Sequence, residues 1–170
     1  MKTVVVGCGR VGAVLADTFD RAGHQVIVVD TSTTAFDRLP SSFRGSAIRG
    51  DGSDEGVLRR AGAIDADIFL AMTEGDNRNV LMAQLAAEEL GARSVIAKIN
   101  DPVRAAAYAD LGVATICRTT LMADAIAGFL GLPVSGMPAI LPAGDLHHSA
   151  AHPVEGDAVA PSAATADQEA

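Results

Sequence analysis

Three glycines near the N-terminus have the spacing Gly-x-Gly-x-x-Gly and could hold a phosphate group. Gly7 permits a tight turn from a strand into a helix, and Gly9 lets the backbone approach a pyrophosphate where any Cβ would collide with it. Gly12 lets the helix pack closely against the strand. The helix N-terminus adds unpaired N–H groups and a partial positive charge, so this turn is typical of a nucleotide-phosphate site.

The remaining positions of the fingerprint are Cys8, Arg10 and Val11. Arg10 would lie at the helix N-terminus beside the phosphates, as a charge-assisted donor. The alternative is a solvated first-turn arginine, which the helix dipole would mildly disfavour. Cys8 is interpreted as a small side chain that fills space beside the turn. A redox sensor is the alternative there, because a helix N-terminus would stabilise a thiolate.

An acidic residue follows at the distance that a ribose contact requires. Asp30 ends the second apolar strand, 18 residues after Gly12, where a carboxylate would accept the hydroxyls of an adenosine ribose. A 2′-phosphate would meet Asp30 as a like charge, and residues 31–34 contain no arginine to receive it. NAD or another unphosphorylated adenosine ribose is therefore favoured over NADP. The alternative is a tight βαβ turn that binds nothing.

A second turn, Gly50-Asp51-Gly52-Ser53, follows the third predicted strand. We expect it beside the adenine, where Asp51 or the turn backbone could accept from the adenine amino group. Gly52 and Ser53 belong to the same candidate site. The alternative is structural: Asp and Ser cap the helix that begins at residue 54, and the glycines permit the turn.

Two residues from later strands complete the candidate site. Thr73 follows the fourth predicted strand and could bond phosphate or ribose. Its loop also holds Asp76, which we expect to cap the next helix. Lys98 lies inside the fifth predicted strand, an unusual place for a charge in a covered sheet. It either points into the crevice or snorkels from the strand end.

The elements that must position these residues alternate along the chain. Apolar runs rich in Val and Ile predict strands at 3–7, 25–29, 46–50, 67–72, 94–99 and 114–117. Amphipathic patterns predict helices at 10–22, 32–39, 54–61, 77–90, 102–110 and 120–131. This alternation indicates an α/β fold of the Rossmann-like, doubly wound kind, with a six-stranded parallel sheet in the order 3-2-1-4-5-6. The ligand crevice would lie at the carboxyl ends of strands one and four.

Composition divides the chain into a nucleotide-binding domain, 1–132, and an Ala/Pro-rich acidic tail, 133–170. The tail has five acids and neither Lys nor Arg, and its composition predicts disorder. A metal site at its His147, His148 and His152 is conceivable, but no metal is predicted. The net charge of −8 argues against nucleic acid as a partner. The chain has no apolar run long enough to span a bilayer, and a strand that begins at once predicts a cytoplasmic protein.

Residues that would carry out chemistry on a bound cofactor are missing. Tyr108 is not followed by the lysine of a Tyr-x-x-x-Lys pair, and His24 is expected on the wrong side of the sheet for an acid–base role. A nucleotide site without such groups favours sensing over hydride transfer, so we expect no enzyme. Two alternatives stay open: an NAD-dependent oxidoreductase or reductase subunit, and an interaction module that binds no nucleotide.

Several sequence blocks together resemble a known family, the RCK or TrkA-N nucleotide-binding domain of bacterial Trk/Ktr-type potassium-uptake regulators. The resemblance covers about residues 1 to 130. It rests on VVVGCGRVG, HQVIVVD, GDGSDEGVLRRAGAIDADIFLAMTEGDNRN and SVIAKINDPVRAAAYADLGVATI. The order and spacing of these blocks are much more specific than the glycines alone.

The resemblance implies a cytosolic regulatory subunit that binds NAD(H), ATP or ADP and gates a membrane potassium-transporting subunit. It implies that Arg10 reaches the terminal phosphate and that Thr73 lines the phosphates. It also implies self-association into a dimer or higher ring. The contact would include apolar residues of the last predicted helix, namely Leu121, Met122, Ala125, Ile126 and Phe129.

Two features depart from the family pattern. Some members carry Pro-Glu after the sixth strand, and that Glu can bind a bridging cation, whereas this chain reads Arg118-Thr119. No metal is therefore carried over. Many members also continue into a second ligand-binding domain, where this sequence has only the tail. We expect that the protein either works with a paralogous regulatory subunit or is a reduced form.

Overall fold

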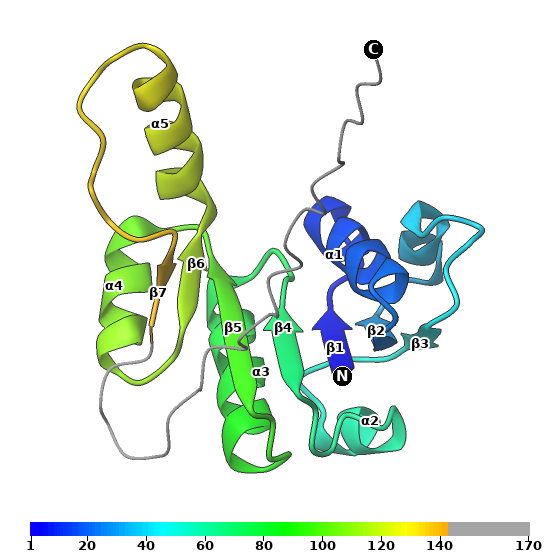
Figure 1. The fold of residues 1–170 in the computed structure, drawn as a ribbon. Helices are drawn as coiled ribbons and strands as arrows, with labels where there is room; N and C mark the ends of the chain where they lie inside the picture. Colours follow the sequence, from blue (N-terminus) through cyan, green and yellow to red (C-terminus); the bar gives the residue numbers. More distant parts are fainter. Residues whose placement is uncertain (143–170) are drawn as a thin grey trace, which may run out of the picture.

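A computed structural model describes residues 1–142 of the chain, and Figure 1 shows how its elements are arranged. The strands are β1 (Lys2–Val6), β2 (Gln25–Asp30), β3 (Ser46–Arg49), β4 (Ile68–Ala71), β5 (Ser94–Ile99), β6 (Thr115–Cys117) and β7 (Ile140–Leu141). The helices are α1 (Arg10–Arg21), the 3-10 helix η1 (Thr33–Arg38), α2 (Glu55–Arg60), α3 (Asp76–Glu88), α4 (Pro102–Asp110) and α5 (Arg118–Phe129).

The strands form one sheet in the order β3-β2-β1-β4-β5-β6-β7. β1 to β6 pair in parallel, while β7 pairs antiparallel to β6. The prediction of a doubly wound parallel sheet in the order 3-2-1-4-5-6 is confirmed, with one additional strand at the edge. The order in which strands are added to the sheet reverses between β1 and β4, so a crevice lies at the carboxyl ends of these two parallel strands.

Both faces of the sheet are buried, and β1 shows how. Val4 and Val6 point into the larger core, which α2, α3 and α4 cover, whereas Val5 points into a smaller cluster beside α1. Figure 1 shows α1 and α3 on opposite faces of the sheet. A strand covered on both faces needs apolar side chains at every position, which explains the unbroken run of valines.

Two local predictions differ from the structure. The segment predicted as a helix over 32–39 is a 3-10 helix. The expectation that Asp76 caps α3 was wrong, because Gly75 is the N-cap residue and makes no side-chain bond. The Asp76 carboxylate instead accepts from the backbone N–H groups of Asn100 (2.9 Å) and Asp101 (3.3 Å) and so ties α3 to the end of β5.

β7 was not predicted, because two residues leave no periodic signal. The chain leaves α5 and turns back, and the Asp124 carboxylate accepts from the backbone N–H of Ser135 (2.8 Å) and from its hydroxyl. β7 then pairs with β6, whose outer N–H and C=O groups would otherwise lack partners. The disorder prediction covered residues 133–170. The structure describes residues 133–142, which include β7, and residues 143–170 lie outside the described part of the chain.

α5 extends beyond the carboxyl end of β6 and away from the sheet (Figure 1). It has no buried residue. Among the helices of residues 1–142, none combines the length and the apolar character needed to cross a bilayer.

Candidate functional site

A cleft opens at the carboxyl ends of β1, β2 and β4, where the topology predicted a crevice. It has an empty volume of about 560 Å³ and is open to solvent. It is lined by Val6, Gly7, Gly9, Val29, Asp30, Thr31, Gly50, Asp51, Gly52, Met72, Thr73, Glu74, Arg78 and Met82. Six of the residues predicted from sequence therefore lie around one cavity, namely Gly7, Gly9, Asp30, Asp51, Gly52 and Thr73.

The three fingerprint positions differ in whether a Cβ atom would fit there. Gly7 has a φ of +102°, and a Cβ there would lie 2.9 Å from backbone atoms of both Met72 and Thr73. A Cβ on Gly12 would overlap the carbonyl oxygen of Gly7. A Cβ on Gly9, by contrast, would meet no protein atom of the described chain within 4 Å. The fold itself requires Gly7 and Gly12, while Gly9 leaves open backbone facing the cleft.

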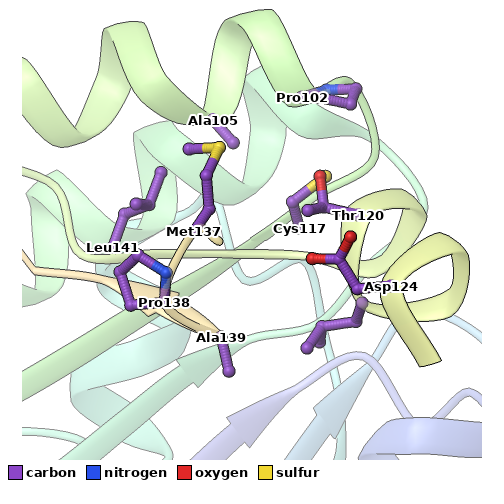
Figure 2. Close-up of a pocket in the computed structure, with 10 residues that line it drawn as sticks. Pro102, Ala105, Cys117, Thr120, Asp124, Met137, Pro138, Ala139 and Leu141 are labelled. Atoms are coloured by element: carbon purple, nitrogen blue, oxygen red, sulfur yellow. The ribbon is translucent and has the colours of Figure 1, made fainter. Parts of the chain in front are cut away.

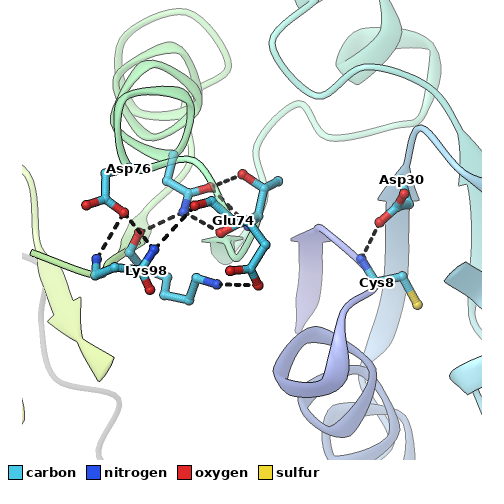
Figure 3. Close-up of polar contacts among 8 residues, drawn as sticks. Cys8, Asp30, Glu74, Asp76 and Lys98 are labelled. Atoms are coloured by element: carbon cyan, nitrogen blue, oxygen red, sulfur yellow. Dashed lines mark hydrogen bonds and ion pairs between the residues drawn. The ribbon is translucent and has the colours of Figure 1, made fainter. Parts of the chain in front are cut away.

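Asp30 is held in place by backbone donors. Its Oδ2 accepts from the N–H of Cys8 at 2.7 Å, and its Oδ1 accepts from the N–H of Ser32 at 2.8 Å. Figure 3 shows the carboxylate joined to the glycine turn through Cys8. Each carboxylate oxygen has a second lone pair, so Asp30 can still accept from two hydroxyl groups of a ligand.

Cys8 is fully buried beside α1 and does not line the cleft. Burial, together with the charge of Asp30, raises the pKa of its thiol despite an opposing effect of Arg38. The thiol is therefore neutral at physiological pH, which disfavours the redox-sensor alternative and agrees with a space-filling side chain. Arg10 and Val11 are exposed, and neither of them nor Gly12 lines the cleft.

The turn after β3 presents Asp51 and Gly52 but not Ser53. The Asp51 carboxylate accepts from both the N–H (2.9 Å) and the hydroxyl (2.7 Å) of Ser53. These bonds, the hydroxyl first, lower the pKa of Asp51, and the charge of Arg78 adds to the effect. Ser53 does not cap α2, because the carboxylate of Asp54 accepts from the N–H of Val57. Ser53 thus orients Asp51 at the cleft.

Thr73 is fixed by a buried amide. Asn79 is 0% exposed, and its Oδ1 accepts from the N–H (3.0 Å) and the hydroxyl (2.6 Å) of Thr73. Its Nδ2 donates to the carbonyls of Thr73 (2.9 Å) and Lys98 (2.7 Å). Because the Thr73 hydroxyl donates to Asn79, it is left as an acceptor toward the cleft. This orientation suits a ribose hydroxyl better than a phosphate.

Lys98 is buried, with a side chain only 6% exposed, and does not line the cleft. Its Nζ lies 3.1 Å from a carboxylate oxygen of Glu74, which does line the cleft and is 80% exposed (Figure 3). The hydrogen bond from Lys98 lowers the pKa of Glu74, and the charges of Lys98, Arg118 and Arg10 act in the same direction. Lys98 therefore does not reach the cleft itself, but it contacts Glu74, which does.

Sequence reasoning missed two charged residues at the cleft and a third beside Asp30. Glu74 and Arg78 come from the loop and first turn that follow β4, and both line it. Arg49 pairs in register with Asp30, and its Nε donates to the carbonyl of Thr31 at 3.3 Å. An arginine therefore lies beside Asp30, although none follows Asp30 directly in sequence. The parallel pairing of β2 and β3, which were both predicted, was the signal that could have found it.

Figure 2 shows a second, smaller cavity between α4, β6, α5 and the segment that leads into β7. Its empty volume is about 320 Å³, and apolar side chains such as Met137 and Leu141 dominate its wall. It contains none of the residues predicted to bind a nucleotide, although Leu121, predicted for self-association, lies in its wall. Within residues 1–142, no three His, Cys, Asp or Glu side chains are arranged to hold a metal ion, and the three tail histidines lie outside this range.

Comparison with proteins of known sequence agrees with the geometry. The family model described as the TrkA-N domain matches residues 3–119. The Trk system potassium uptake protein TrkA of Streptomyces coelicolor is 44% identical over 124 residues, which cover 73% of this chain and 56% of that protein. A TrkA homolog of Archaeoglobus fulgidus is 33% identical over 142 residues, which cover 78% of this chain and 31% of that protein. The chain thus matches only part of the length of these relatives.

Solved structures support the fold. The TrkA-N domain of the Escherichia coli inner membrane protein ybaL superposes with a TM-score of 0.67 at 19% identity, covering 76% of this chain and 96% of that one. The AMP-bound Kef C-terminal domain of Shewanella denitrificans gives 0.61 at 22% identity, covering 77% and 82%. Both similarities indicate a shared fold. On the extent of the family match, the chain belongs to the TrkA-N domain family.

Proposed function

We propose that this chain is the nucleotide-sensing part of a potassium-uptake regulator and that it binds NAD(H), ATP or ADP in the cleft. One observation carries the proposal: the open backbone at Gly9 and the backbone-held carboxylate of Asp30 face the same cavity. A nucleotide-binding strand–helix–strand unit places the phosphates at the turn after its first strand and the ribose at the end of its second strand. Membership of the TrkA-N family supports the assignment.

The cleft offers a separate contact for each part of an adenine nucleotide. Asp30 would accept the ribose hydroxyls, and the first-turn N–H groups of α1 would donate to the phosphates, since Gly9 brings no capping side chain. Asp51 would take the adenine amino group. Arg10, at the first position of α1, would reach the terminal phosphate.

The same proposal extends to the partner and the assembly. Relatives carry names that refer to potassium uptake. We infer that this chain acts at the cytoplasmic side of a membrane potassium-transporting subunit, alone or with a paralogous regulator. Nucleotide binding would shift the chain between states that bias the transporter.

Self-association would use α5. Its side chains Met122, Ile126 and Phe129 are exposed, and Phe129 is 91% exposed. Free apolar side chains of this size are rare on a monomer surface when they lie on one helix. A second copy of this chain, contributing the same helix, is the partner that would cover them.

An NAD-dependent oxidoreductase is less well supported. Its acid–base group would have to come from Thr73 or Lys98, but the Thr73 hydroxyl donates to Asn79 and the Lys98 ammonium pairs with Glu74. Oxidation of bound NADH by any carbonyl substrate would favour the enzyme instead.

Native mass spectrometry tests the proposal directly. The purified protein, mixed with ATP, ADP or NADH, should retain one nucleotide per subunit and form dimers or larger rings. Asp30→Asn should lower nucleotide occupancy, since an amide cannot accept both ribose hydroxyls. Asp37→Asn, which makes the same charge change at an exposed position outside the cleft, should not. Equal occupancy in both variants would contradict the ribose role of Asp30, and no retained nucleotide in the wild type would overturn the proposal.

A further inference from the structure

Glu74 stands between a nucleotide cleft and a buried cation. Its carboxylate lines the cleft and lies 3.1 Å from the ammonium of Lys98. The two side chains differ sharply in burial, since Lys98 is 6% exposed and Glu74 is 80% exposed. A buried ammonium needs an anionic partner, but the partner that Lys98 has is free to be hydrated. Glu74 can therefore leave Lys98 without being transferred into an apolar environment.

The backbone on both sides of Glu74 is fixed, so that only its side chain need move. On one side, Asn79 ties Thr73 to the carbonyl of Lys98. On the other, Asp76 accepts from the N–H and the Nδ2 of Asn100, each at 2.9 Å. Both ties connect the loop to the end of β5. A change of rotamer at Glu74 would expose Lys98 to the cleft without unfolding any element.

Other positive charges surround the same point. Arg10 and Arg118 both lie close enough to lower the pKa of Glu74, in addition to the larger effect of Lys98. Arg10 begins α1, directly after the glycine turn, and Arg118 begins α5, directly after β6. Lys98 is thus in direct contact with the Glu74 carboxylate, and two further cations from other elements act on it at longer range. Without Glu74, this corner would be strongly attractive to a polyanion.

We propose that Glu74 is a displaceable internal counterion, and that the terminal phosphates of a nucleoside triphosphate replace it at Lys98. This inference rests on the proposed function of the cleft. It makes Glu74 and Lys98 residues that determine specificity between nucleotides of different phosphate length. A monophosphate such as AMP would occupy the cleft and leave the Glu74–Lys98 pair intact, whereas ATP would have to displace Glu74 and would gain the ammonium.

Isothermal titration calorimetry of the full chain with ATP and with AMP tests this competition. Glu74→Gln removes the competing charge, so it should tighten ATP binding by about fivefold while changing AMP binding by less than about twofold. The double variant Glu74→Gln, Lys98→Met should lose that gain. Glu88→Gln is the matched control, because Glu88 is exposed at the far end of α3 and makes the same charge change. It should leave both affinities unchanged.

The outcomes separate this inference from the proposal on which it rests. If ATP and AMP both bind and Glu74→Gln leaves their affinity ratio at the wild-type value, the role of Glu74 is overturned and the nucleotide cleft stands. If neither nucleotide binds the wild type, both fall. Should Glu74→Gln fold poorly by circular dichroism, Glu74→Asp retains the charge on a shorter side chain and should shift the ratio in the same direction, less strongly. An unchanged ratio in Glu74→Asp would then overturn the role of Glu74.

Discussion

The cleft and the arm, by which we mean α5 and residues 130–142, differ in how their side chains are held. Side chains of the cleft are fixed by hydrogen bonds, whereas those of α5 are uncovered. In the cleft, Asp30 is held by backbone donors and Thr73 by a fully buried amide. In the arm, α5 has no buried residue, and the side chain of Phe129 is 91% exposed. Side chains that are fixed within one chain suit the binding of a small ligand. Exposed apolar side chains on a helix are typical of a surface that contacts a second macromolecule.

The two regions are also joined. β5 and β6 are neighbours, and Arg118, the first residue of α5, contributes to the positive field at Glu74. A ligand that changes the charge at this corner would therefore change the electrostatic field at the first residue of α5.

The largest effect is expected at the glycine turn. Gly12→Ala places a Cβ on the carbonyl oxygen of Gly7 and should lower the free energy of unfolding by about 3 kcal/mol or more. Gly9→Ala is the matched control, because its Cβ meets no described atom within 4 Å. It should change stability by less than about 1 kcal/mol and still weaken nucleotide binding. Urea denaturation measures the first effect and calorimetry the second.

Asn79 holds the Thr73 loop beside the cleft. Its removal should destabilise the fold nearly as much as Gly12→Ala. Asn79→Ala removes four hydrogen bonds and leaves the carbonyl of Lys98 without this donor. We expect a loss of about 2–3 kcal/mol in the free energy of unfolding, together with weaker nucleotide binding. Gln84→Ala, at an exposed position of the same helix, should do neither. Wild-type stability in Asn79→Ala would show that the loop is not held as described.

In the arm, substitution should alter assembly and leave the fold intact. Phe129→Glu puts a charge on the most exposed apolar position of α5 and should weaken self-association by about tenfold or more, because the charge would be buried at the contact. Its melting temperature as a monomer should match that of the wild type. Analytical ultracentrifugation measures the first property. An unchanged dissociation constant would remove α5 from the contact.

The smallest effect concerns the bond that fastens the arm. Bonds from Ser135 lower the pKa of Asp124. A carboxyl with a lowered folded-state pKa stabilises the fold above its ordinary pKa, and this contribution disappears as the pH falls through the lowered value. Asp124→Asn should therefore lower the melting temperature by about 2 °C at pH 7, and this difference should shrink as the pH falls below the ordinary pKa of an aspartate. A difference that does not change with pH would mean that the effect is not due to the carboxylate charge.

The sequence predicted the strand order and the position of Asp30 because both depend on local signals. Valine runs mark buried strands, and the glycine spacing marks the turn. Arg49, Asn79 and Glu74 were missed because their roles depend on partners from distant strands. Arg49 lies beside Asp30 only because of the register of β2 and β3. Asn79 acts through the carbonyl of Lys98, 19 residues later.

β7, at the edge of the sheet, could not be predicted from the sequence either. The unpaired side of β6 could be expected from the strand order, but nothing in residues 133–142 marks which two of them pair with it. The contact depends on the Asp124–Ser135 bonds that turn the chain back. Alternation signals need several residues, and a strand of two residues provides none.

The most direct test of the central claim is the response of backbone amides to a nucleotide, measured by NMR on the isotope-labelled chain. Titration with ATP should shift the amide resonances of Gly9, Asp30 and Thr73 in a saturable way, while those of β7 and the cavity beside Met137 stay in place at low nucleotide concentration. Shifts confined to α4, α5 and β7, or no saturable shifts at all, would contradict the account.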